Sequence, residues 1–371
     1  MPTNIILSKI HNIKNECLVH VLNSETCYVY SLETKKNLID SNNNAQPFSF
    51  YQNSDSQYIV LQDFSRNEIT PGSLFFASPK GFFRKVFEPK SSDNVLFITG
   101  QCNNYCIMCS QPPILKNDFS FYEKLNSLII QLMPEDTLEI GITGGEPTLL
   151  RAKLVDTIRD IYKRCPNINI HMLSNGRAFA NKKYASLFGE FNQKSLLMGI
   201  PLHSDFHSTH DFIAGQIGSY YQTMIGLYNL AFFEVAIEIR IVINKQNFER
   251  LPQLSSYIFR NLPFVKHVAF MGLETTGLTI KNKKSVWVDP IEYVSYLEKA
   301  VYEISEWGIE TSIYNIPLCL LKPTLYRFSK KSISDWKLSF AEQCQCCLLS
   351  EECCGVFSTS KIQSNNIKTF Q

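Results

Sequence analysis

Three cysteines in one short segment are the residues of this chain best suited to chemistry. Cys102, Cys106 and Cys109 follow a C-x3-C-x2-C spacing. A [4Fe–4S] cluster normally takes four cysteine thiolates, so a loop with three leaves one iron for a remote residue or an exogenous ligand. Zinc would instead favour paired C-x2-C units that supply four ligands. The spacing therefore predicts an iron–sulfur cluster with one open iron.

A Gly-Gly-Glu-Pro sequence provides the second candidate site. Gly144 and Gly145 let the backbone approach a ligand closely, and Glu146 offers an acceptor for a ligand ammonium group. Pro147 suits the first turn of a helix. Alone, such a segment is most often an ordinary turn between a strand and a helix. Its position one predicted strand after the cysteine loop favours a ligand-binding role.

A second group of cysteines lies toward the C-terminus. Its members are Cys319, Cys344, Cys346, Cys347, Cys353 and Cys354, from a total of 12 cysteines in 371 residues. A disulfide framework is typical of small secreted chains, whereas this chain is large and begins with nothing like a signal peptide. The clustering therefore indicates a second metal site, for which zinc and an iron–sulfur cluster are both chemically suitable.

The elements that must position these motifs form a repeating pattern from residue 94 onward. Apolar strand candidates at 95–99, 138–143, 168–174, 196–202, 235–243 and 267–273 alternate with helix candidates near 119–133, 149–164, 178–189, 217–232 and 249–260. This pattern predicts an α/β fold, a partial (β/α)6 TIM-type barrel. Functional groups on such a barrel lie at the C-terminal ends of the strands, where both motifs occur.

The remaining segments flank this barrel. Residues 1–90 contain β-prone runs at 27–30, 58–61 and 73–76 and a polar stretch over 36–54 that we interpret as a loop. We predict a small β-rich N-terminal domain over 1–90, the barrel over 91–285, and a C-terminal extension with an auxiliary metal or cluster site over 286–371.

Overall composition limits the partners. The 36 basic and 34 acidic residues leave a net charge of +2, which provides no electrostatic reason to expect a nucleic acid or an anionic membrane as a partner. No apolar run is long enough to span a bilayer. We expect a soluble cytoplasmic protein with neither kind of partner.

The cysteine loop after the first strand, together with GGEP after the second, resembles the radical S-adenosylmethionine superfamily. The resemblance implies that Cys102, Cys106 and Cys109 hold a [4Fe–4S] cluster whose open iron is chelated by S-adenosylmethionine. An electron from this cluster would cleave the sulfonium to a 5′-deoxyadenosyl radical, which abstracts a hydrogen atom. The GGEP turn would hold the amino group of the cofactor.

The same resemblance assigns further cofactor contacts. Ser174 and Asn175, at the end of the third strand, would contact the ribose or carboxylate. Met108 stands where the family usually has an aromatic residue and would cover the adenine. Arg240, a charge in an apolar strand, would pair with the cofactor carboxylate or structurally with Glu238 or Glu274.

Three histidines follow the fourth predicted strand. His203, His207 and His210 could bind a metal, but no fixed helical register and no neighbouring cysteine support this interpretation. We expect loop residues that face solvent or substrate.

The C-terminal cysteines resemble the auxiliary-cluster region of peptide-modifying radical enzymes. Cys344, Cys347 and Cys353 match a C-x2-C-x5-C pattern, and Cys319 would be the fourth ligand. Phe357 occupies the position at which the longer family pattern continues with cysteine. The resemblance thus implies one auxiliary [4Fe–4S] cluster, with zinc as the alternative.

Longer runs resemble the C-type maturase of the His-Xaa-Ser system, over about residues 94–360. They lie at 106–113, 142–150, 261–265, 269–274, 315–321 and 332–337. The resemblance implies a peptide substrate with His-Xaa-Ser repeats, a second radical maturase, and an electron donor such as flavodoxin or ferredoxin. Two other functions remain open: a radical enzyme acting on RNA, a lipid or a small metabolite, and a non-catalytic zinc or iron–sulfur scaffold.

Overall fold

The computed structural model describes residues 5–6, 16–21, 26–32, 45–49, 70–80, 82–331 and 337–370. The chain divides into two compact units. The first comprises Met1–Thr99, Asn117–Thr143 and Leu150–His171, and the second comprises Gly100–Lys116, Gly144–Leu149 and Met172–Gln371. Both cysteine groups and the GGEP turn belong to the second unit. The bounds 1–90, 91–285 and 286–371 stay a prediction.

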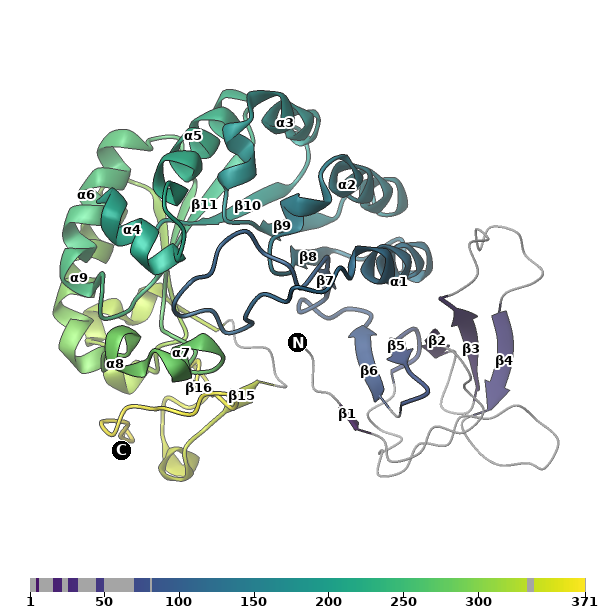
Figure 1. The fold of residues 1–371 in the computed structure, drawn as a ribbon. Coiled ribbons are helices and arrows are strands. Elements are labelled where there is room, and N and C mark those ends of the chain that lie inside the picture. The colour runs from purple at the N-terminus through teal and green to yellow at the C-terminus, as the bar shows by residue number, and fades with distance from the viewer. Residues whose placement is uncertain are drawn as a thin grey trace. The chain divides into compact units, whose positions relative to one another are not determined.

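A parallel sheet carries the candidate site (Figure 1). In the described residues it has eight strands in chain order: β7 (Val95–Phe97), β8 (Glu139–Thr143), β9 (Asn169–Leu173), β10 (Leu196–Pro201), β11 (Ala236–Val242), β12 (His267–Met271), β13 (Glu310–Tyr314) and β14 (Ser329–Lys330). This partial TIM barrel confirms the predicted fold class. Strands occur at all six predicted positions, and β13 and β14 extend the sheet beyond them.

Helices follow these strands, as the alternating pattern predicts. They are α1 (Phe119–Leu132), α2 (Ala152–Arg164), α3 (Lys182–Ser186), α4 (His207–Ala214), α5 (Ser219–Phe232), α6 (Leu251–Asn261), α7 (Leu278–Lys281), α8 (Lys283–Val286) and α9 (Pro290–Glu306). The predicted helix at 178–189 is broken: α3 lies between 3₁₀ turns at Arg177–Ala180 and Leu187–Phe191. The helix α4 was not predicted. Its sequence mixes histidine, serine and aspartate with apolar residues, which obscures the helical periodicity.

Alternation along the strands separates an apolar core from a polar face. Ile239 and Ile241 on β11 are fully buried, as are Val268 and Phe270 on β12. The alternate positions of the same strands carry polar side chains such as Arg240. Because successive side chains of a strand point to opposite faces, one face packs against hydrophobic neighbours and the other supplies polar groups.

The N-terminal part of the chain forms an antiparallel sheet. In the described residues its order is β1 (Ile5–Ile6), β6 (Phe82–Phe87), β5 (Leu74–Ala77), β2 (Cys17–Val21), β3 (Thr26–Ser31) and β4 (Ala45–Ser49). The predicted strands at 27–30 and 73–76 correspond to β3 and β5, whereas 58–61 lies outside the described residues. The expectation of a loop over 36–54 is wrong at Ala45–Ser49, which form the strand β4. This strand pairs with β3 at the edge of the sheet formed by the described residues, a position where a proline such as Pro47 is tolerated.

The C-terminal segment is fastened to the turn after β12. The Thr275 hydroxyl donates to the Ile362 carbonyl at 2.7 Å and accepts from the Ile362 N–H at 2.9 Å. The Thr275 N–H donates to the Ser360 hydroxyl at 3.0 Å. A two-stranded sheet of β15 (Leu338–Ser339) and β16 (Val356–Phe357) lies in the same segment. Within the part of the chain that is described, no helix is long and apolar enough to cross a membrane.

Candidate metal and cofactor site

The cysteine loop runs between β7 and α1 and is held from two directions (Figure 1). At the end of α4, the Ile213 carbonyl accepts from the Ile107 N–H at 2.9 Å. At the start of α7, the Leu278 N–H donates to the Cys109 carbonyl at 2.8 Å. Gly277 has φ +56°, and a Cβ there would lie 2.5 Å from the carbonyl oxygens of both Cys109 and Ser110. Glycine therefore allows the α7 turn to contact the loop.

The three cysteines of this loop are free thiols that are close enough to interact. The pKa of Cys102 is raised to about 11 and that of Cys106 to about 12, mainly by burial, with the neighbouring Cys109 contributing in the same direction. Burial also raises the pKa of Cys109. A metal that binds here must displace protons from the thiols and supply the charge that stabilises the thiolates.

The described residues contain no group of three or more His, Cys, Asp or Glu side chains arranged for a single metal ion. Thiolates around a cubane stand farther apart than thiolates around one ion, because the iron and sulfide atoms of the cluster lie between them. From Cys102 to Cys109 the donor set is three thiols and contains no carboxylate or imidazole. It suits the predicted cluster.

The GGEP turn and the Ser174-Asn175 turn are joined by a buried carboxylate. Glu146 is 0% exposed. Its Oε1 accepts from the Thr148 hydroxyl at 2.6 Å, the Thr148 N–H at 3.0 Å and the Ser174 hydroxyl at 2.8 Å. Its Oε2 accepts from the Asn175 N–H at 2.7 Å. Burial raises the pKa of Glu146, and these donors oppose that shift.

This arrangement refines the expected role of Glu146. Four donors of the protein already fill most of its acceptor capacity, so the carboxylate joins the two turns that were predicted to contact the cofactor. Pro147 begins a 3₁₀ turn, Pro147–Leu150, as its restricted φ favours. The contacts of Gly144, Glu146, Ser174 and Asn175 with a cofactor remain predictions.

Gly145 brings the GGEP turn against the start of the cysteine loop. The Glu146 N–H donates to the Gln101 carbonyl at 2.8 Å. A Cβ on Gly145 would lie 2.2 Å from the same carbonyl oxygen. Gly145 is thus required by the approach of the chain's own backbone, a role the sequence analysis did not include.

Met108 and Arg240 have protein partners in this structure. Met108 is 8% exposed and packs with Ile213 and Val286 in a small hydrophobic cluster. The Nη1 atom of Arg240 lies 2.6 Å from Oε1 of Glu238, which is one of the two structural pairs considered from sequence. Adenine and carboxylate contacts for Met108 and Arg240 stay predictions.

The histidines after β10 differ from expectation. His203 and His210 are buried rather than facing solvent, with ring centroids 5.2 Å apart. The backbone N–H of His203 donates to the ring atom Nδ1 of His210 at 3.2 Å. Burial lowers the pKa of both rings, that of His210 to about 4. Only His207 is exposed, so the solvent-facing interpretation is wrong for His203 and His210. The expected loop is also wrong for His207 and His210, which lie on α4.

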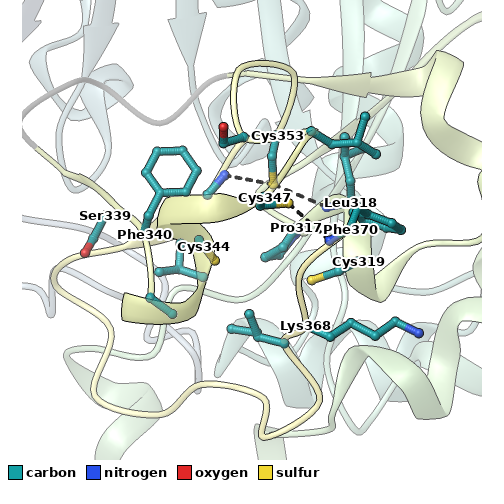
Figure 2. Close-up of a pocket in the computed structure, with 16 residues that line it drawn as sticks. Pro317, Leu318, Cys319, Ser339, Phe340, Cys344, Cys347, Cys353, Lys368 and Phe370 are labelled. Atoms are coloured by element: carbon teal, nitrogen blue, oxygen red, sulfur yellow. Dashed lines mark hydrogen bonds between the residues drawn. The ribbon is translucent and has the colours of Figure 1, made fainter.

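Four cysteines of the second group line one pocket near the C-terminus (Figure 2). Cys319, Cys344, Cys347 and Cys353 all line it, and its space of about 390 Å³ is partly open to solvent. These are the four residues predicted as ligands of an auxiliary site. The neighbouring Cys346 and Cys354 are absent from this lining. Four thiols are the number of ligands that a closed [4Fe–4S] cluster or zinc requires, although the described residues are not arranged around a single metal ion.

Backbone N–H groups point at the sulfurs of this pocket (Figure 2). Sγ of Cys353 accepts from the N–H groups of Leu318 and Gly355, each at 3.4 Å. Sγ of Cys347 accepts from the Phe370 N–H at 3.4 Å. The Cys354 thiol beside Cys353 lowers the pKa of Cys353 to about 6, and the two N–H groups contribute in the same direction. Hydrogen bonds of this kind stabilise thiolate ligands.

One residue near the cysteine loop was missed by the sequence analysis. Arg177 directly follows the Ser174-Asn175-Gly176 turn, and its guanidinium contacts the backbone carbonyl of Asn103. The sequence offered one signal for Arg177: a positively charged residue directly follows a turn that was predicted to contact the cofactor.

Comparison with known proteins agrees with these observations. Residues 96–252 match the family model described as Radical SAM superfamily. An uncharacterized protein of Methanocaldococcus jannaschii, MJ0907, is 28% identical over 222 residues, which are 58% of this chain and 72% of that protein.

Two solved structures are similar at low sequence identity. Streptococcus suis SuiB bound to S-adenosylmethionine has 14% identity and a TM-score of 0.47, with coverage of 59% of this chain and 49% of that one. Native anSMEcpe with bound AdoMet has 17% identity and a TM-score of 0.46, with coverage of 59% and 62%. The match thus spans about half of the SuiB chain. The family match covers the cysteine loop, the GGEP turn and most of the parallel sheet, and so places residues 96–252 of this chain in the radical SAM superfamily.

Proposed function

We propose that this protein is a radical S-adenosylmethionine enzyme that modifies a ribosomally made peptide bearing His-Xaa-Ser repeats. One observation carries the proposal: three segments with cofactor motifs are bonded directly to one another. Gln101 next to Cys102 accepts from the N–H of Glu146, and Glu146 accepts from Ser174 and Asn175. A non-catalytic zinc or iron–sulfur scaffold would not need the cysteine loop to be bonded to two turns with cofactor motifs.

The cysteine loop and the two turns beside it would have different roles in the site. Cys102, Cys106 and Cys109 would hold a [4Fe–4S] cluster, and the GGEP and Ser174-Asn175 turns would orient S-adenosylmethionine on its open iron. When bound, the reduced cluster supplies one electron, which converts S-adenosylmethionine to methionine and a 5′-deoxyadenosyl radical that takes a hydrogen atom from the substrate. Flavodoxin or ferredoxin would supply the electron.

The C-terminal pocket would hold a second, closed cluster. Its four cysteines can saturate the metal site, which leaves no position for an exogenous ligand. The hydrogen bonds of Thr275 fasten the same C-terminal segment to the turn that precedes α7. Since α7 also holds the cysteine loop, both sites rest on one turn of the barrel.

The peptide substrate is supported by the resemblance over residues 94–360 to the C-type maturase of the His-Xaa-Ser system. The same resemblance supports a second radical maturase as a partner. These assignments concern the substrate and partners, and they are independent of the cleavage of S-adenosylmethionine, so separate measurements can test them.

The test begins with the full chain, reconstituted anaerobically with iron and sulfide. Incubation with S-adenosylmethionine and dithionite is expected to yield 5′-deoxyadenosine, measured by liquid chromatography with mass spectrometry. A synthetic peptide with His-Xaa-Ser repeats is then added, and its mass is followed. A fully loaded protein that forms no 5′-deoxyadenosine would contradict the proposal. Formation of 5′-deoxyadenosine without a change in the mass of the peptide would contradict only the peptide assignment.

The auxiliary site has its own test. Replacement of Cys353 with alanine is expected to lower the iron content from about eight to about four atoms per chain, taking four per cubane. Cys346→Ala is the matched control, because Cys346 is exposed and does not line the pocket. An unchanged iron content in Cys353→Ala, or bound zinc in the wild-type protein, would argue against the auxiliary cluster.

A further inference from the structure

Arg177 holds a guanidinium beside the first ligand of the cysteine loop. Its Nη1 donates to the Asn103 carbonyl at 2.5 Å and to Oδ1 of Asn104 at 2.7 Å. Its Nε donates to Oε1 of Gln222, on α5, at 2.7 Å. Because three hydrogen bonds in different directions fix the plane of the group, its position relative to Cys102 is well defined.

The charge of this guanidinium acts on the cysteines. Burial lowers the pKa of Arg177, and Cys102, Glu146, Asp211 and Cys106 are the acidic groups near enough to oppose this shift when they are ionised. Even so, an arginine remains protonated at neutral pH. Two of these four groups are thiols of the cysteine loop, which become negatively charged when a metal displaces their protons.

The two carboxylates near Arg177 are already engaged elsewhere. Glu146 accepts four hydrogen bonds from the GGEP and Ser174-Asn175 turns. Asp211 accepts from the N–H groups of Gly218 at 2.6 Å and Tyr220 at 2.7 Å, where it orders the start of α5. Neither carboxylate is oriented solely toward Arg177, so the positive charge remains available to act on the loop.

We propose that Arg177 is a positioning residue that holds a fixed positive charge against the open cluster and raises its reduction potential. This inference rests on the proposed function. Reduction makes a cluster more negative, and a nearby cation stabilises the reduced state more than the oxidised state. Partial burial weakens the screening by salt. Arg177 thereby eases the entry of the electron on which cleavage depends.

A purely structural clamp would have a different consequence. Asn103 and Asn104 could be held by any donor of suitable length, and the loss of such a clamp would affect assembly without a systematic effect of charge. The reduction potential therefore separates the two roles, and a lysine at position 177 separates charge from the planar hydrogen-bonding geometry.

The experiment is a redox titration of the reconstituted full chain, followed by electron paramagnetic resonance. The open cluster is recognised by the change in its signal when S-adenosylmethionine is added. At the wild-type midpoint, Arg177→Gln is expected to lower the ratio of reduced to oxidised cluster at least about tenfold, which is 59 mV for one electron. Arg177→Lys should stay close to wild type.

Two further variants keep the test independent of folding. Gln222→Glu retains the arginine but places an opposite charge on its Nε partner, so its potential should fall in the same direction by a smaller amount. Arg159→Gln, an equal change of charge at an exposed residue of α2, should leave the potential unchanged.

The outcomes separate this inference from the proposed function. Equal potentials for wild type, Arg177→Gln and Gln222→Glu would overturn the inference, as would an equal fall in Arg177→Lys and Arg177→Gln. If Arg177→Gln assembles no cluster, the midpoint potentials of Arg177→Lys and Gln222→Glu test the inference in its place. A wild-type protein that assembles no iron–sulfur cluster would instead overturn the proposed function itself.

Discussion

Replacement of Cys106 with alanine is expected to reduce 5′-deoxyadenosine formation by more than about a hundredfold, since even loss of an outer-shell partner commonly costs about 10–100-fold. Cys106 is one of only three ligands that the loop offers, so no thiolate beside it can take over its iron. The Cys106 side chain packs against the hydrophobic residues Met108, Ile213 and Val286, and this packing fixes its direction. A change at this position therefore removes a ligand that is both scarce and well oriented.

Product formation and iron content measure this effect together. Cys346→Ala provides the control, because it removes one thiol from an exposed site with the same chemical change. We expect Cys346→Ala to cleave S-adenosylmethionine at the wild-type rate. A Cys106→Ala protein that retained full iron loading and turnover would contradict the assignment of the loop.

Replacement of Gly145 with alanine is expected to have the next largest effect, a loss of about a hundredfold in cofactor cleavage, as a misplacement of 1 Å can cause. The added methyl would stand 2.2 Å from the carbonyl oxygen and 2.6 Å from the carbonyl carbon of Gln101. These are backbone atoms that cannot rotate away, so the GGEP turn must separate from the cysteine loop. The hydrogen bond from Glu146 to Gln101 would break.

A matched glycine tests whether the effect is local. Gly189→Ala introduces the same methyl near Phe233, where the nearest atom is a side-chain carbon at 3.2 Å. We expect Gly189→Ala to retain most of the activity in the same assay, and circular dichroism to show both variants folded. Wild-type turnover in Gly145→Ala would show that the two segments need not be in contact.

Local patterns in the sequence predicted the barrel well. Strand and helix periodicities depend on neighbouring residues, so β7 to β12 and the helices α1, α2, α5 and α6 follow from the order of apolar and polar side chains, whereas α4, α7, α8 and α9 were not predicted. The four cysteines that the resemblance names as ligands, Cys319, Cys344, Cys347 and Cys353, line one pocket, and their role as ligands stays a prediction. Even so, β4 was missed, because a polar segment became a strand only by pairing with β3.

Contacts between distant segments were beyond such patterns. The four donors around Glu146 come from two turns that the chain brings together only in the folded state. The burial of His203 and His210 depends on α4, whose sequence has little periodicity. Arg177 contacts a segment more than seventy positions away. In each case a residue type was visible in the sequence, whereas its partner was set by tertiary packing.

The manner in which the cysteine loop is held has a consequence for the supply of iron. Its fastenings to α4, α7 and the GGEP turn are backbone hydrogen bonds and a hydrogen bond from the Thr279 hydroxyl to the Met108 carbonyl, and none of them uses a thiol. The loop can thus take its shape before any metal arrives, in contrast to small zinc domains that fold only with metal. Under the proposed function, we therefore expect a cell short of iron to accumulate folded protein whose activity returns on repletion without new synthesis.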